Sequence, residues 1–362
     1  MYPVTIIEIE RAIQHRTPLG MRATLGKPSG PFKNVLVTVK QTPYEQYLQN
    51  KAQGIAPVAL RWERLRNRFE AHKECVDNVR DILKRSGANF SVLSREEMHR
   101  GSLMDIDLLV AVGGDGTILN AASFVDESIP VLGVNSDPTK PEERGLTNMK
   151  DERRSTGALC ATCATNIEEA LPRVLSGDIP ARLRSRIQCI VRSTYTETRL
   201  PPALNDILIA HPSPAAVSRF RLHVNKGKVR SSQECNARFK EEEQEEFSLN
   251  AWSSGIWICT SMGSTAAMAS AGGFAMHRDS RNLQYMIREH LLEEGQHREN
   301  GHGIVEPHKM INIRWNSQYG CVYVDGSHMT HDLSLGDEVK MDCHAPKVHI
   351  FDSVDVFPQN FS

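Results

Sequence analysis

The stretch that decides the fold is residues 105–117, which read DIDLLVAVGGDGT. The unbroken apolar run at residues 108–112 is typical of a strand that is buried on both faces. The glycines that follow, Gly113, Gly114 and Gly116, allow a sharp turn and a close approach of the backbone to a ligand. Because open α/β sheets bind ligands at the carboxyl ends of their strands, the stretch predicts a buried parallel strand that ends in a binding turn.

Asp115 is unusual within a turn of this kind. A carboxylate beside phosphates is repelled unless it holds Mg²⁺ or removes a proton, and both roles belong to phosphoryl transfer. Backbone N–H groups in the turn, together with the start of a helix, suit a phosphate group. A plain strand-to-helix turn is the alternative, since Gly and Asp are favoured there too. The buried strand before the turn favours the phosphate site.

Strands and helices alternate around this turn. Residues 34–39, 89–93 and 129–134 read as further strands, and residues 60–86 carry apolar side chains at helical spacing. Helical crossovers between strands indicate a parallel sheet. We therefore predict an α/β nucleotide-binding domain over residues 31–160, preceded by an N-terminal extension over residues 1–30.

The second half of the chain reads as short strands separated by turn residues. The candidates are residues 187–191, 204–210, 220–224, 256–260, 311–315 and 321–324. We predict a β-rich, dinucleotide-binding domain over residues 161–344, with a polar loop at residues 225–250. Residues 345–362 are expected to pack back on the first domain.

Asn205 and Asp206 are polar residues inside one of these apolar strands. An unpaired buried polar group costs about 1 to 3 kcal/mol, so the pair needs partners. An amide offers a donor and an acceptor, and a carboxylate accepts from two vicinal hydroxyls, which suits adenine and ribose. A hydrogen bond to a neighbouring loop or a position at a sheet edge explains the pair equally well when it is taken alone.

Gly263, Ser264 and Thr265 mark a turn after the strand at residues 256–260. Ser and Thr favour helix N-caps, and an N-cap turn also presents N–H groups to a ligand. Arg182, Arg184 and Arg186 recur at every second residue and so line one strand face, as a solvated face or as a basic stripe beside a phosphate site.

Composition narrows the class of protein. A net charge of -1 gives no basic balance that points to nucleic acid. No window of 18 apolar residues predicts a membrane helix, and the first 30 residues lack the apolar core of a secretory signal. Eight cysteines scattered along 362 residues indicate reduced thiols. We expect a cytoplasmic protein, and a mitochondrial or peroxisomal location stays open.

These motifs, in this order, resemble the signature of the NAD kinase family. The matching segments are GGDGT at 113–117, GVN at 133–135, Asn205-Asp206, TSMGSTA at 260–266, SAGG at 270–273 and VDG at 324–326. GVNSDP at 133–138, RSTG at 154–157 and Ala267 depart from the bacterial pattern. They are similar to a divergent eukaryotic subgroup that includes plant NADH kinases and mitochondrial NAD kinases.

The resemblance implies ATP-dependent phosphorylation of NADH or NAD at the 2′-hydroxyl of the adenosine ribose. Asp115 would be the catalytic base, and Gly113, Gly114, Gly116 and Thr117 would hold the phosphates of ATP. Mg²⁺ would arrive with ATP and have no protein ligands. The resemblance also implies a homodimer. The residues expected to bind NAD(H) are Asn135, Asn205, Asp206, Thr260, Gly263, Ser264, Thr265, Ala266 and Ser270.

Two other functions are compatible with parts of this pattern. A lipid kinase of the diacylglycerol or sphingosine kinase type shares the GGDGT turn, but it would need an apolar cleft or a membrane-binding segment. A protein that binds a dinucleotide without turnover would keep the fold, although the unaltered Asp115 counts against this function.

Overall fold

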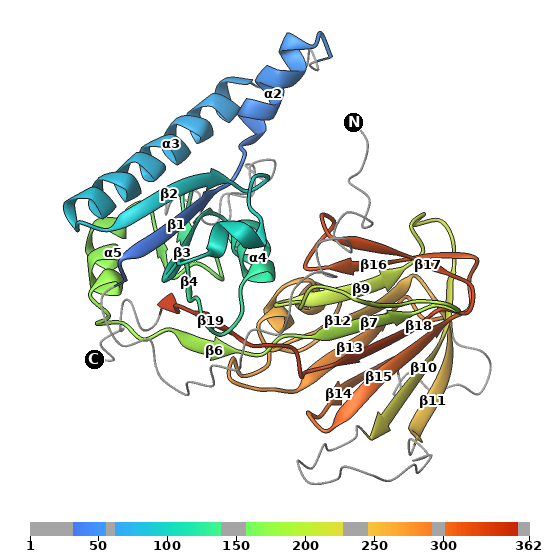
Figure 1. The fold of residues 1–362 in the computed structure, drawn as a ribbon. Helices are drawn as coiled ribbons and strands as arrows, with labels where there is room; N and C mark the ends of the chain where they lie inside the picture. Colours follow the sequence, from blue (N-terminus) through green and yellow to red (C-terminus); the bar gives the residue numbers. More distant parts are fainter. Residues whose placement is uncertain (1–31, 56–61, 139–156, 227–244, 292–300, 354–362) are drawn as a thin grey trace. The chain divides into compact units, whose positions relative to one another are not determined.

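A computed structural model of the chain describes residues 32–55, 62–138, 157–226, 245–291 and 301–353. The predicted N-terminal extension and residues 154–156 of the RSTG motif lie outside the described residues. Three sheets carry the fold, and all of them lie in the unit that begins at Phe32 (Figure 1).

The first sheet contains the motif strand and confirms the predicted parallel α/β fold. Each neighbouring pair of strands from β2 to β19 is parallel, and β6 runs antiparallel to β19. The short strand β5 (Thr162–Cys163) pairs with the last two residues of β4, at the end of the sheet where the motif turn also lies. The strand order is β2 (Asn89–Ser94), β1 (Asn34–Val39), β3 (Leu108–Gly113), β4 (Val131–Asn135), β19 (Val348–Ile350) and β6 (Arg182–Arg184).

Helices cover both faces of this sheet (Figure 1). The helices α3 (Trp62–Arg85) and α5 (Ile167–Leu175) pack on one face, and α4 (Asp115–Phe124) packs on the other. Alternate residues of β1 pack on opposite faces of the sheet. Val35 lies in the core with α3, whereas Leu36 lies in the core with α4. This division explains why the strands are apolar without alternation, since both of their faces are buried.

Two antiparallel sheets form the β-rich part, as the sequence predicted. Buried residues from both of them contribute to one apolar core, as in a β-sandwich. One sheet has the order β11 (Glu245–Ser253), β10 (Ser218–Lys226), β15 (Lys309–Trp315), β18 (Glu338–Asp342), β7 (Gln188–Arg192) and β8 (Glu197–Arg199). The other has the order β14 (His302–Val305), β13 (Leu283–Arg288), β12 (Gly255–Cys259), β9 (Asp206–Ala210), β16 (Tyr319–Val324) and β17 (Thr330–Ser334).

The α/β part extends beyond the predicted boundary at residue 160. The apolar face of α5 lies in the same core as α3, and β6 belongs to the first sheet. The chain therefore enters the β-rich part only between Arg184 and Gln188. Near the C-terminus it returns, because β19 lies between β4 and β6. Most of the expected polar loop at residues 225–250 lies outside the described residues; of its two ends, β10 runs to Lys226 and β11 starts at Glu245.

Helix α2 (Pro43–Ala52) connects β1 to α3 and starts with a capping box. The Thr42 side chain accepts a hydrogen bond from the N–H of Glu45, and the Glu45 carboxylate accepts one from the N–H of Thr42. This reciprocal pair satisfies two donors at the helix start. No helix in the described part of the chain is long and apolar enough to span a membrane.

A buried arginine links the α/β part to the β-rich part. Arg186 is 1% exposed, and its guanidinium donates to the carbonyl oxygens of Ala122 (2.7 Å) and Val125 (3.0 Å) at the end of α4. It also donates to the carbonyl oxygens of Pro346 and Lys347, just before β19. Burial lowers the pKa of Arg186 to about 10. Four carbonyl groups from two distant segments therefore depend on one side chain.

Replacing this side chain should destabilise the protein strongly. The change Arg186→Leu leaves four acceptors without their donor, and we expect the free energy of unfolding to fall by roughly 3 kcal/mol or more. The control Arg192→Leu removes an exposed ion pair with Glu197 and should cost less than about 1 kcal/mol. Urea unfolding of both variants measures the difference, and equal losses would contradict the role of Arg186.

Candidate active site

The predicted phosphate turn lies where β3 gives way to α4. Gly114 is the N-cap of α4, and Asp115 is the first residue of the helix. A Cβ atom on Gly113 would lie 2.2 Å from Oγ1 of Thr117, so no side chain fits at this position. A Cβ atom on Gly116 would meet nothing within 4 Å. The turn is therefore tightly packed at Gly113 and open at Gly116, where the first N–H groups of the helix can bind an anion.

Two backbone N–H groups hold the carboxylate of Asp115. Ala158 donates to Oδ2 at 3.1 Å, and Leu159 donates to Oδ1 at 2.9 Å. Each carboxylate oxygen has a further lone pair, so the group can still accept a proton from a ligand. The clamp holds the carboxylate in one orientation at the edge of the phosphate turn.

Asn135, one of the residues predicted to bind NAD(H), lies next to the same turn. It ends β4 and is the register partner of Gly113 in the parallel sheet. Its side chain is buried, and Oδ1 accepts from the N–H of Asp137 at 3.3 Å. Gly157 packs against it with φ 65°, where a Cβ atom would lie 2.5 Å from Nδ2 of Asn135. The turn that begins at Gly157 therefore positions both Asn135 and Asp115.

A second group of predicted residues surrounds the start of β9. Asp325 has φ 50°, and its carboxylate accepts three backbone N–H groups. The donors are Leu204 (2.7 Å), Asn205 (2.7 Å) and Asp206 (3.0 Å). These bonds hold the backbone of Asn205 and Asp206, so the side chains of this pair remain available to a ligand.

The polar side chains of this pair are incompletely satisfied within the described part of the chain. Asn205 Oδ1 is buried and has no hydrogen-bond partner there. Burial, and secondarily the charge of Asp325, raise the pKa of Asp206 to about 7. Burial also raises the pKa of Asp325 to about 6, although its three N–H bonds and Arg186 act in the opposite direction. The unpaired oxygen of Asn205 lies beside a carboxyl group whose ionisation is costly. Both groups suit a ligand that donates hydroxyl or amine hydrogens.

The segment at residues 260–266 packs against this pair. Thr260 Oγ1 donates to the carbonyl oxygen of Leu204 at 2.5 Å and accepts the N–H groups of Met262 (3.1 Å) and Gly263 (3.3 Å). A Cβ atom on Gly263 would lie 2.1 Å from the carbonyl oxygen of Asn205, so only glycine allows this approach. The segment thus serves as a tight support for Asn205.

The predicted ligand residues of this segment divide into two kinds. The Ser264 side chain is fully buried and bonds inside the protein, to the carbonyl oxygen of Ser261 and the N–H of Met276. Thr260 is committed in the same way, so both hydroxyls hold the loop. Thr265 and Ser270 are exposed, and Ala266 is half-buried. Direct contact with a ligand is therefore open to Thr265, Ala266 and Ser270.

The two groups of residues meet at one apolar cluster. Leu204 and Met262 of the β-rich part pack with Ile118 of α4 and with Leu159 and Cys160. Leu159 is also a donor to Asp115, and Leu204 immediately precedes Asn205. A small pocket between these segments is lined in part by Ala158, Leu159 and Met262. The structure therefore brings the phosphate turn and the dinucleotide motifs to the same place.

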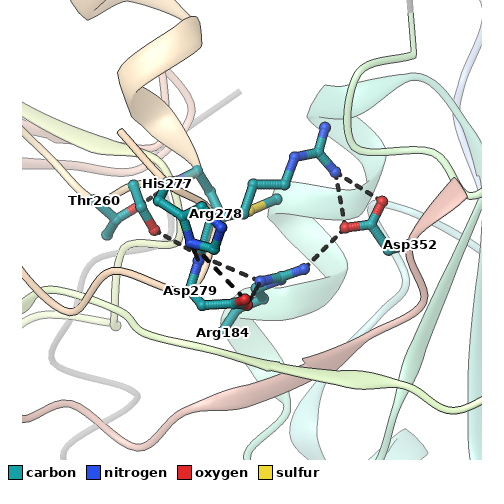
Figure 2. Close-up of polar contacts among 8 residues, drawn as sticks. Arg184, Thr260, His277, Arg278, Asp279 and Asp352 are labelled. Atoms are coloured by element: carbon teal, nitrogen blue, oxygen red, sulfur yellow. Dashed lines mark hydrogen bonds and ion pairs between the residues drawn. The ribbon is translucent and has the colours of Figure 1, made fainter. Parts of the chain in front are cut away.

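An ion-pair network (Figure 2) includes three of the residues that line this pocket, Arg184, Arg278 and Asp352. Asp352 lies between two guanidinium groups, with Arg184 at 2.8 Å and Arg278 at 2.8 Å. Arg184 also donates to Asp279 at 2.6 Å. The side chains of Arg184 and Asp352 are only 2% and 5% exposed. The network ties the loop after α6 (Ala267–Ser270) to β6 and to the segment after β19.

Sequence reasoning missed two parts of this arrangement. Arg184 and Arg186 are buried and form hydrogen bonds inside the protein. The alternative that they belong to a solvated strand face is therefore wrong. The side chains of Lys40, Arg68 and His72 gather at the end of β1, and no motif drew attention to them. For Lys40, its position directly after an apolar strand was the one sequence feature that could have indicated a role in the site. In the described part of the chain no three His, Cys, Asp or Glu side chains are grouped so as to hold a metal ion.

Comparison with known proteins agrees with this geometry. Residues 62–137 match the model of the ATP-NAD kinase N-terminal domain. The "Probable NADH kinase" of Oryza sativa subsp. japonica is 39% identical over 297 residues, which cover 82% of this chain and 84% of that protein. This chain belongs to the NAD kinase family. The "NADH kinase" of Arabidopsis thaliana is 37% identical over 322 residues, which cover 88% of this chain and 96% of that protein.

Solved structures of the family share the fold. Yeast NADH kinase in complex with NADH superposes with a TM-score of 0.58 at 16% identity, over 91% of this chain and 88% of that one. An NAD kinase from Archaeoglobus fulgidus in complex with ATP superposes with a TM-score of 0.57 at 16% identity, over 91% and 97%. The two plant relatives, at 39% and 37% identity, confirm the resemblance of the sequence to plant members of the NAD kinase family.

The raised pKa of Asp206 predicts a pH-dependent stability. An aspartate has a pKa of about 3.9 in the unfolded chain, and ionisation above that value costs more in the folded protein. Folding stability should therefore fall as the pH rises from about 4 through 7, the folded-state pKa.

The substitution Asp206→Asn removes this cost. Its advantage in unfolding free energy over the unsubstituted protein should grow between pH 5 and pH 8, by something on the order of 1 to 3 kcal/mol. Urea unfolding at the two pH values measures it. Asp332→Asn changes an exposed carboxylate in β17 of the same sheet and should show no such growth. An equal advantage of Asp206→Asn at both pH values would contradict the burial of a costly charge.

Proposed function

We propose that this chain transfers the γ-phosphoryl group of ATP to the 2′-hydroxyl of the adenosine ribose of NADH or NAD. One observation carries the proposal. The Asp115 carboxylate is held at the glycine turn by two N–H groups, and one of the donors, Leu159, packs in the same cluster as Leu204, which precedes the Asn205–Asp206 pair. The chain belongs to the NAD kinase family, and its plant relatives are named NADH kinases.

In this mechanism Asp115 accepts the proton of the ribose hydroxyl as that oxygen attacks the γ-phosphorus. General-base assistance of this kind contributes roughly 10² to 10⁴ in rate. Gly113, Gly114, Gly116 and Thr117 present the turn and the helix start to the phosphates. The clamp from Ala158 and Leu159 lowers the entropic cost of reaching the reactive geometry, because the carboxylate is already oriented.

The dinucleotide is held from the β-rich part. Asn205 Oδ1, which has no partner in the described part of the chain, accepts a hydrogen bond from the bound nucleotide. Asp206 accepts from hydroxyl groups of a ribose, and these donors would favour its ionised form. Thr265, Ala266 and Ser270 lie on the accessible side of the supporting loop, and Asn135 completes the site from the end of β4.

Several parts of the proposal rest on family relatives. The Archaeoglobus structure is described as a complex with ATP and the yeast structure as a complex with NADH, which supports these two substrates here. We propose that Mg²⁺ arrives with ATP as part of the substrate. A homodimer and a cytoplasmic location remain proposals as well. The named relatives are NAD or NADH kinases, so a lipid kinase or a binding protein without turnover has no support among them.

A coupled assay tests the reaction. Purified protein receives ATP, Mg²⁺ and either NADH or NAD, and the formation of NADPH or NADP is measured. We expect product from at least one nucleotide and a loss of roughly 10² to 10⁴ in kcat for Asp115→Asn. Asp81→Asn, on the exposed surface of α3, serves as the control and should leave the rate unchanged.

Binding of the dinucleotide to Asp115→Asn distinguishes a chemical role from a structural one. NADH affinity close to that of the unsubstituted protein, together with the lost rate, supports a base. A variant that keeps its full rate would rule out the role of Asp115. If the folded, unsubstituted protein phosphorylates neither nucleotide, the kinase proposal fails, and diacylglycerol and sphingoid bases become the next substrates to test.

A further inference from the structure

The order of the strands places a ligand-binding crevice between β1 and β3. From β1 the chain crosses to β2 on one side, and from β3 it crosses to β4 on the other side. The point at which the winding direction reverses is where open parallel sheets bind ligands, just beyond the carboxyl ends of the strands. The glycine turn occupies the β3 side of this crevice. The proposed function assigns nothing to the β1 side.

Lys40 occupies the β1 side. It directly follows β1, and its N–H donates to the carbonyl oxygen of Val112 at 3.2 Å, so its backbone runs beside the end of β3. Its Cβ atom lies 3.3 Å from the position that a Cβ atom on Gly113 would take. The side chain of Lys40 therefore starts in contact with the phosphate turn.

The Lys40 side chain lies near both a carboxylate and a second cation. Burial lowers the pKa of Lys40, Asp137 opposes this change, and Arg68 adds to it. The backbone of Lys40 forms a hydrogen bond with the His72 ring, whose Nδ1 lies 2.8 Å from Oγ of Ser136. Burial, followed by the charge of Lys40, lowers the pKa of His72 to about 4. His72 is therefore neutral at pH 7 and supports Lys40 as a hydrogen-bond partner.

Arg68 supplies a second cation to the same cluster. Its Nε lies 3.8 Å from Oδ2 of Asp137, which is a loose ion pair. Its Nη2 is buried, and no described residue accepts a hydrogen bond from it. Asp137 thus acts on Lys40 and pairs loosely with Arg68, while Glu45 acts on the neighbouring His72. A buried guanidinium N–H without an acceptor is costly, and an anionic ligand would remove that cost.

We propose that Lys40 and Arg68 bind the phosphate chain of the nucleoside triphosphate that serves as the phosphoryl donor, opposite the glycine turn. This inference rests on the proposed function. The glycine turn supplies N–H groups but also the negative charge of Asp115, so a triphosphate needs cations from elsewhere. The dinucleotide motifs lie around β9 in the β-rich part, whereas Lys40 and Arg68 belong to the α/β part and Lys40 lies beside the glycine turn, and so the cation pair is assigned to the donor.

Calorimetric binding of two ligands tests the assignment without turnover. The probes are the Mg²⁺ complex of an ATP analogue with an imido group between the β- and γ-phosphates, and NADH alone. Lys40→Met keeps the apolar stem and removes the charge. We expect its affinity for the analogue to fall by at least about tenfold, the loss of one charge-assisted hydrogen bond, and its NADH affinity to change by less than about twofold.

Matched controls come from exposed positions on α3. Lys73→Met removes an exposed lysine next to His72 and should leave both affinities unchanged. Arg68→Met, compared with Arg80→Met at an exposed site, provides an independent pair that decides the question if Lys40→Met does not fold. Analogue affinity equal to that of the unsubstituted protein in folded Lys40→Met, or in Arg68→Met when the former is unfolded, would show an internal ion pair only and overturn the inference.

The two proposals fail in different ways. A chain that phosphorylates NADH or NAD while Lys40→Met binds the analogue normally keeps its proposed function and loses this inference. A chain that binds the analogue through Lys40 but phosphorylates neither dinucleotide keeps the inference as a triphosphate site and loses the proposed acceptor.

Discussion

The geometry of the site depends on one buried guanidinium group. Arg186 precedes β7 and binds carbonyl oxygens at the end of α4 and before β19. Asp115 begins the same helix α4, and Asn205 lies in the β-rich part, which starts just after Arg186. A guanidinium has five donors in a rigid plane, so it can satisfy several carbonyls at once where a lysine could not. Arg186 thereby joins the start of the β-rich part to the end of α4, away from the proposed base and the proposed dinucleotide-binding residues.

Two aspartates in this protein form hydrogen bonds with backbone N–H groups, and the two arrangements have opposite roles. The Asp115 side chain is held by the backbone of Ala158 and Leu159, whereas the Asp325 side chain holds the backbone of Asn205 and Asp206. The second arrangement destabilises the ionised forms of Asp206 and Asp325, because it keeps the two carboxyl groups close together and buried. Proteins tolerate such local conflicts mainly at functional sites, where a bound ligand relieves them. The unfavourable environment of Asp206 is thus consistent with a site that is completed by substrate.

Sequence alone predicted the parts of the fold that depend on neighbouring residues. The glycine turn follows from an apolar run and three glycines, and the Asn205–Asp206 pair stands out because it interrupts an apolar strand. Contacts between residues far apart in the chain produce no recognisable local sequence pattern. Arg184 pairs with Asp352, 168 residues away, so alternation alone could not show that it is buried. Helix α5 has an apolar face that would suit either domain, and for that reason the boundary was predicted too early. Lys40, Arg68 and Asp137 come from three separate segments, and only the folded sheet brings them together.

The position of β19 has a consequence for how the chain is made. This strand pairs with β4 and β6, which precede it by about 215 and 165 residues in the chain, and the whole β-sandwich lies between β6 and β19. On a ribosome, β4 emerges early with one flank covered only by the two-residue strand β5. An uncovered strand flank is a template for pairing with other chains. The first sheet is thus complete only when β19, near the end of the described residues, has been synthesised. Until then the flank of β4 that pairs with β19 stays unpaired and can pair with other chains.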